Sequence, residues 1–143
     1  MSFTDDIDRF RSKVRNNSTL VIRKIAIEML RRVVMRTPVG NPALWQSSGP
    51  AGYVGGTARG NWMLTTTSPA TGTEGAPDAS GSRALTRALP ALQGWVGQGS
   101  IFIVNNLPYI TRLESGWSSQ APHGMVAVTV AEFQGIVEQE AKP

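Results

Sequence analysis

Few side chains in this sequence could carry out acid–base or nucleophilic chemistry. The 143 residues contain one histidine, His123, and no cysteine. Thiol nucleophiles, disulfides, iron–sulfur clusters and cysteine-based zinc sites are therefore excluded. A nucleophilic serine would need a base, and His123 is the one imidazole that the sequence offers. It lies between Pro122 and Gly124 with no acid close in sequence, which favours an incidental loop histidine over a catalytic one.

Carboxylates that could form a hydrolytic pair lie in separate predicted elements, and no motif links them. These carboxylates are Glu74, Asp78, Glu114 and Glu132, and we interpret them as solvated surface groups. The sequence also lacks the phosphate-loop, dinucleotide-binding, zinc-protease, nucleophile-elbow and calcium-loop patterns. We therefore expect no enzymatic activity, no cofactor and no metal site.

Basic charge is concentrated at the N-terminus. Residues 1–36 carry a net charge of +5, whereas the remaining residues carry a net charge of −1. Such a basic segment can contact nucleic acid or an acidic protein surface. No helix-turn-helix, zinc-finger or RNA-recognition signature is present. Non-specific nucleic-acid binding through the basic segment is therefore the alternative function to the one inferred below.

The basic segment is predicted to form one long amphipathic helix. Ser2 and Asp5 have the spacing of a capping box, and Pro38 requires the helix to end near Arg36. Apolar residues at helical spacing form a stripe roughly 100° wide, which we expect to pack on the rest of the chain. The stripe consists of Phe3, Ile7, Phe10, Val14, Val21, Ile25 and Met29.

A second apolar stripe lies on the opposite side of this predicted helix. Leu20, Ile27 and Val34 recur with a spacing of seven residues. A helix that is apolar on two sides needs two packing partners. Either another helix of the same chain covers the second stripe, or a neighbouring subunit does.

The composition changes to Pro, Gly and Ser over residues 37–60, which predicts a long loop. Loops of more than about 15 residues in a compact domain are usually functional or disordered. This one contains Trp45 and Tyr53, aromatic residues that disordered linkers tend to lack. We expect the loop to be ordered by contact, either with its own sheet or with a partner.

The remaining residues, 61–143, are predicted to form a sheet with helices. Together with the segments above they give one α+β domain over residues 1–143, with a long N-terminal helix and a C-terminal helix packed on a small, mostly antiparallel sheet. Alternation of Val126, Val128 and Val130 would also suit a strand, but Val126, Val130, Phe133 and Val137 keep helical spacing, so we favour a helix. The predicted elements are strands at 61–68 and 95–106, a helix near 82–92 capped by Asp78 or Ser82, a short helix at 109–115, and a helix at 122–140 that covers one stripe of the N-terminal helix.

Four stretches in a particular order carry a family resemblance. They are RTPVGNPALW, GPAGYVGGTARGNW, IFIVNNLPYITRLESGWSSQAPHGMV and VTVAEFQGIV. In this order they resemble the small neck and tail-completion proteins of tailed bacteriophages, over nearly the whole chain. Many members of that family have a shorter TPVDTG turn, where this chain has TPVG followed by a longer Pro/Gly loop.

The resemblance implies a structural virion protein without catalytic activity. Such a protein completes the tail, or joins the head connector to the tail, as a homo-oligomeric ring through which the genomic DNA passes without specific binding. The implied ring is a hexamer, or a dodecamer where the symmetry of the portal persists. The implied partners are further copies of the chain, a head-closure or connector protein, and a tail terminator or tail tube protein.

The expected location is the virion neck, after synthesis in the host bacterial cytoplasm. No apolar run approaches the length of a membrane-spanning helix, so we expect no membrane association. Arg59, Tyr109 and Glu114 belong to the family-like stretches, and turn formation and core packing are the alternative roles for them. The hypothetical subunit and partner interface consists of Leu20, Ile27, Val34, Trp45, Tyr53, Arg59, Tyr109 and Glu114.

Overall fold

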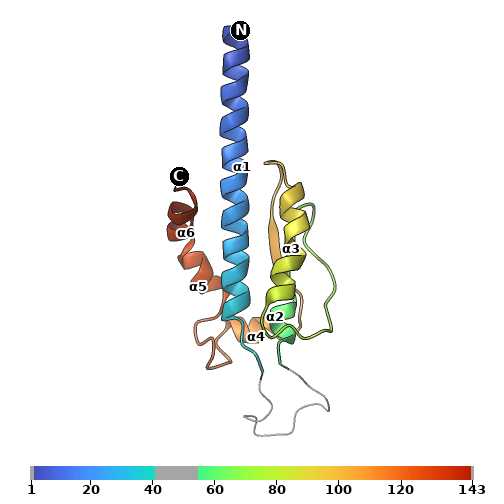
Figure 1. The fold of residues 1–143 in the computed structure, drawn as a ribbon. Coiled ribbons are helices and arrows are strands. Elements are labelled where there is room, and N and C mark those ends of the chain that lie inside the picture. Colours follow the sequence, from blue (N-terminus) through green and yellow to red (C-terminus); the bar gives the residue numbers. More distant parts are fainter. Residues whose placement is uncertain (1, 41–54, 143) are drawn as a thin grey trace, which may run out of the picture.

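The computed structural model describes residues 2–40 and 55–142 and has the predicted α+β architecture. One long helix stands beside a two-stranded sheet and several shorter helices (Figure 1). The elements in chain order are α1 (Phe3–Arg36), α2 (Thr57–Gly60), β1 (Trp62–Thr65), α3 (Ser82–Gly94), β2 (Phe102–Asn105), α4 (Ile110–Glu114), α5 (Val126–Ala131) and α6 (Phe133–Glu140).

Helix α1 begins and ends where the sequence predicts. The Ser2 hydroxyl accepts a hydrogen bond from the Asp5 amide, and the Asp5 carboxylate accepts one from the Ser2 amide, which completes the capping box. Thr37, the residue before Pro38, has extended backbone and terminates the helix. At 1.5 Å per residue, 34 residues span about 50 Å.

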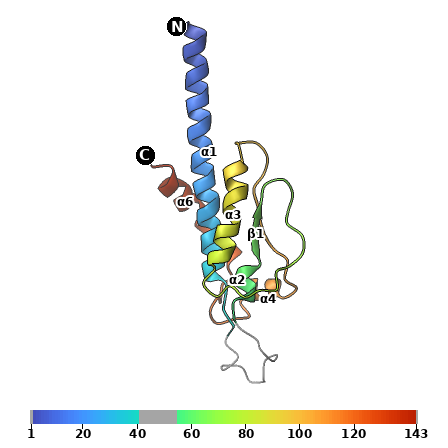
Figure 2. The ribbon, with the colours of Figure 1, turned by 45° about the vertical axis from the view of Figure 1, so that its right-hand side comes forward.

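The N-terminal half of α1 extends beyond the rest of the molecule (Figures 1 and 2). Thr19 is buried, and none of the side chains that the structure describes before it is buried. The other elements pack along the C-terminal half of the helix only, where α3, α5, α6 and β1 all contact it. The two halves of α1 therefore have different surroundings.

The sheet consists of β1 and β2 paired antiparallel. Trp62 lies opposite Asn105, and Thr65 lies opposite Phe102. The predicted alternation of β1 is confirmed, because Trp62 and Leu64 are buried and the residues between them are only partly buried. Both strands are shorter than predicted, with four residues each.

The core lies between the C-terminal half of α1, the sheet and α3. Leu30 and Val34 of α1 are fully buried. They pack with Trp62 and Leu64 of the sheet and with the small residues of α3. The small α3 residues, Ala84 and Ala88, allow two helices to lie close together without large side chains between them.

The predicted assignment of the two faces of α1 is partly wrong. Val34 is buried in the core and Ile27 packs against it, so the second stripe turns into the molecule at its C-terminal end. Phe3, Phe10 and Val14, which were expected to pack on the body, are 79%, 67% and 48% exposed. The physical reason is length, because α1 extends past every element that could cover them.

The predicted C-terminal helix is two helices in the structure. Helix α5 begins at Val126 rather than near residue 122, and Glu132 separates it from α6. The strand alternative for this segment is excluded. Helix α6 contacts α1, as the sequence analysis expected.

Two further local predictions need correction. Residues 57–60, expected in the loop, form the short helix α2. Of the two candidate caps for α3, Asp78 is the one used, because its carboxylate accepts hydrogen bonds from the amides of Arg83 and Ala84. Asp78 is consequently buried and is not the solvated group that was expected.

Two leucines of α1 provide a matched test of this core. Leu30 is fully buried and Leu20 is 50% exposed. Leu30→Ala is expected to lower the free energy of unfolding by about 2–5 kcal/mol, because it leaves a cavity. Leu20→Ala is expected to change it by less than about 0.5 kcal/mol. Urea denaturation of both variants measures the difference, and similar losses would contradict the placement of α1.

Candidate interaction surface

The carboxylates considered for catalysis are each engaged within the fold. Asp78 caps α3, and Glu114 accepts hydrogen bonds from three consecutive backbone amides. Glu132 forms an ion pair with Arg36, and Glu74 lies 3.9 Å from Arg87. His123 is exposed, and the described residues contain no cluster of three or more His, Asp or Glu that could hold a metal ion.

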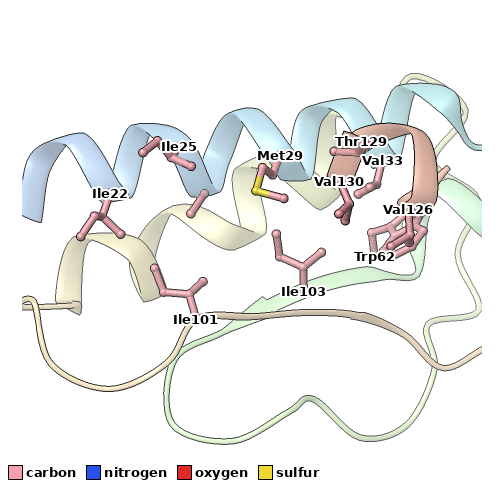
Figure 3. Close-up of a pocket in the computed structure, with 11 residues that line it drawn as sticks. Ile22, Ile25, Met29, Val33, Trp62, Ile101, Ile103, Val126, Thr129 and Val130 are labelled. Carbon is pink, nitrogen blue, oxygen red and sulfur yellow. The ribbon is translucent and has the colours of Figure 1, made fainter. Parts of the chain in front are cut away.

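The body contains an apolar groove of about 360 Å³ (Figure 3). One wall is the C-terminal half of α1, the opposite side is formed by β1, β2 and the segment that leads into β2, and α5 closes one end. We call this feature the groove. Its lining residues are Ile22, Ile25, Ala26, Met29, Val33, Trp62, Ile101, Ile103, Val126, Thr129 and Val130.

The polar atoms in the groove lining already have partners inside the chain. The indole N–H of Trp62 donates to the Thr37 hydroxyl at 2.7 Å. The Thr129 hydroxyl donates to the Met125 carbonyl at 2.7 Å and accepts from Arg36 at 2.9 Å. A polar small molecule would find little to bind in such a groove. An apolar surface is the better match.

Ion pairs hold α5 and α6 against α1. Arg36 and Arg32 both reach Glu132, the residue between the two helices. The Arg36 guanidinium, with help from Arg32, lowers the pKa of Glu132. On the same face of α1, a hydrogen bond from Arg31, together with one from Arg32, lowers the pKa of Glu28 to about 2. The ion pairs with Glu132 hold α5 in the position where it closes one end of the groove.

A second apolar surface lies on the part of α1 that extends beyond the body. It consists of Phe3, Ile7, Phe10 and Val14, and we call it the ridge. Their spacing of three and four residues places them on one side of the helix. Ile7 is partly buried, and the other three are largely exposed. Contiguous exposed apolar side chains of this size mark interaction sites.

Two of the predicted interface residues, Arg59 and Glu114, form hydrogen bonds with backbone groups at helix ends. Arg59 donates hydrogen bonds to the carbonyls of Met35, Thr37 and Ala79 at 3.0, 2.8 and 2.7 Å. Carbonyls at the end of a helix lack partners within it, so Arg59 caps the C-terminus of α1. This is the turn-forming role that the sequence analysis named as the alternative.

Glu114 has a similar capping role at α5. Its carboxylate accepts from the amides of Met125, Val126 and Ala127 at 2.8–3.0 Å. Burial raises the pKa of Glu114, but the three amide donors outweigh that effect, so its pKa lies below the ordinary value. The cap explains why α5 begins at Val126.

The remaining predicted interface residues have varied positions. Leu20 is half exposed, whereas Val34 is covered by the chain's own core. Tyr109 precedes α4 and is 40% exposed. Trp45 and Tyr53 lie outside the described residues.

The sequence analysis missed an exposed cation–π pair near the end of α4. Trp117 is 77% exposed, and the Arg112 guanidinium lies 5.7 Å from the centre of its ring. Helix α4 lies at the opposite end of the molecule from the N-terminus (Figure 1). Exposed tryptophan and arginine are typical of the strongest contributors to protein interfaces. The signal was present in the sequence as a tryptophan directly after the glycine that ends the predicted helix.

Comparison with family models, with curated proteins and with solved structures gives no significant match for this chain. Among the helices that the structure describes, none has the length and apolar character that crossing a membrane requires.

The cap on α5 can be tested with Glu114→Gln. The substitution removes the charge that the three amides stabilise, and the free energy of unfolding is expected to fall by about 1 kcal/mol at neutral pH. Because the folded-state pKa is depressed, this contribution is present above the ordinary pKa of glutamate. It is lost as the pH falls through the folded value.

Urea denaturation from neutral to acidic pH should therefore show the wild type and Glu114→Gln converging in stability as the solution becomes acidic. Glu140→Gln is the control, because the Glu140 side chain forms no hydrogen bond or ion pair with another described residue. An offset between Glu114→Gln and the wild type that stays constant down to acidic pH would contradict the carboxylate cap.

Proposed function

We propose that this chain is a structural subunit of a bacteriophage neck. In this role it forms a homo-oligomeric ring that completes the tail or joins the head connector to the tail. The observation that carries the proposal is the presence of two separate apolar surfaces, the ridge and the groove, on a chain whose candidate catalytic carboxylates are engaged in its own fold. The order of the family-like sequence stretches supports the same conclusion.

Two different apolar surfaces suit a ring better than a two-fold dimer. In a ring built head to tail, each subunit uses one surface toward the copy before it and another toward the copy after it. A symmetric dimer uses the same surface twice. The resemblance to neck proteins favours a hexamer, with a dodecamer as the alternative.

Contact with an adjacent ring needs a third surface. The Trp117 and Arg112 pair is exposed at the end of the molecule opposite the N-terminus. This position suits contact with the next component along the axis, which is a head-closure or connector protein on one side and a tail terminator or tail tube protein on the other. Location in the virion neck follows from the same proposal.

One observation favours nucleic-acid binding as a second candidate. Arg9, Arg11 and Lys13 are exposed on the extending half of α1, and no ion pair between described residues involves them. Such side chains can contact phosphates. Strong contacts would slow the passage of DNA through a ring, so we expect only weak binding.

The proposed role is tested in a phage that encodes the chain. A stop codon early in its reading frame is expected to leave filled heads and finished tails unjoined in electron micrographs. Wild-type protein supplied from a plasmid should restore joined particles. Trp117→Ala is expected to lower the yield of joined particles at least tenfold, and His123→Ala should restore them fully because His123 is an exposed residue with no role in the proposal. Joined, infectious particles that lack the chain would overturn the proposal.

Duplex binding distinguishes the two candidate functions. The wild-type chain is expected to bind a duplex weakly, and this binding should disappear at physiological salt because a few exposed cations release few counterions. Replacing Arg9, Arg11 and Lys13 with Gln should abolish the residual binding. Sub-micromolar affinity at physiological salt, measured by fluorescence anisotropy, would favour the nucleic-acid alternative.

A further inference from the structure

We propose that the ridge of one copy packs into the groove of a neighbouring copy. The inference rests on the proposed function, because it names the contact that builds the ring. The ridge is an apolar surface on an extending helix, and the groove is an apolar concavity on the body (Figures 1 and 3). Packing the two surfaces together buries the apolar side chains of both.

A ridge can occupy the groove only if it belongs to another molecule. The ridge and one wall of the groove belong to the same continuous helix, α1. The ridge lies toward its N-terminus, on the part of α1 that extends beyond the other elements (Figure 2). It cannot reach the groove of its own chain unless α1 breaks. A second copy offers the same ridge without any change in fold.

The two surfaces match in length. The ridge extends from Phe3 to Val14, and the α1 wall of the groove extends from Ile22 to Val33. Each interval covers the same number of residues, so each is about 16 Å long at the helical rise. All four ridge side chains can therefore contact the groove at once.

The ridge supplies part of the area that a specific contact needs. A phenylalanine buries about 150–250 Å² when fully covered, and the ridge offers two that are mostly exposed, together with Ile7 and Val14. The ridge alone would therefore bury roughly 500 Å². A standard interface buries about 800 Å² per partner. The remaining area of each contact between neighbouring copies comes from residues beside the ridge and the groove.

The contact can be tested by disulfide trapping, because the chain has no cysteine. Ile7→Cys and Val14→Cys place a thiol at either end of the ridge, and Val130→Cys places one at the groove, where Val130 is 56% exposed. Each ridge variant is mixed with Val130→Cys and oxidised. Ser12→Cys is the matched control, since Ser12 lies on the same extending half of α1 but on its other side.

At least one ridge variant is expected to form the mixed disulfide about tenfold faster than Ser12→Cys, as measured on non-reducing gels. Which end of the ridge reacts gives the orientation of the helix in the groove. Equal rates for ridge and control variants would overturn the contact. Occupation of the groove by a different partner would also give equal rates.

Phe10→Asp separates this inference from the proposed function. Phe10 is 67% exposed, so the variant should keep the circular dichroism spectrum and melting temperature of the wild type. It is expected to fail to restore joined particles in the phage that lacks the chain. If Phe10→Asp restores them fully, the ridge contact is overturned while the neck function stands. If the disulfide forms but particles join without the chain, the contact stands and the neck function fails.

Discussion

The burial of one side of α1 is the interaction on which the rest of the structure depends. Leu30 and Val34 lie fully inside the molecule, and the sheet, α3, α5 and α6 are all arranged around this half of the helix. Apolar burial is the main favourable term in folding, and here one helix provides the common surface for it. Because α1 extends beyond the elements that pack on its C-terminal half, the same packing that builds the core leaves the ridge uncovered.

The second constraint is the need to satisfy backbone groups at helix ends. Arg59 supplies donors to carbonyls at the end of α1, and Glu114 and Asp78 supply acceptors to the amides at the start of α5 and α3. Charged residues of this kind resemble site residues when only their types and order are known. In this chain their charges hold the short elements together, which leaves the apolar surfaces as the basis for a functional proposal.

Local signals in the sequence predicted the parts of the fold that local physics determines. The Ser2 capping box, the end of α1 before Pro38 and the alternation around Trp62 need only neighbouring residues. The orientation of α1 was less predictable, because helical periodicity defines a stripe but does not say how far the body extends along it. The break between α5 and α6 and the groove depend on contacts between distant segments. The start of α5, for example, depends on a carboxylate at Glu114.

The continuity of α1 fixes the angle between the ridge and the groove in the proposed assembly. One unbroken helix carries both the ridge and a wall of the groove, so their relative azimuth is fixed by the number of residues between Val14 and Ile22. Each residue inserted there would rotate one surface by about 100° relative to the other and shift it by about 1.5 Å. Since a heterologous contact closes only at a particular rotation and otherwise winds into an open helix, the length of this intervening stretch determines whether the subunits form a closed circle or a filament.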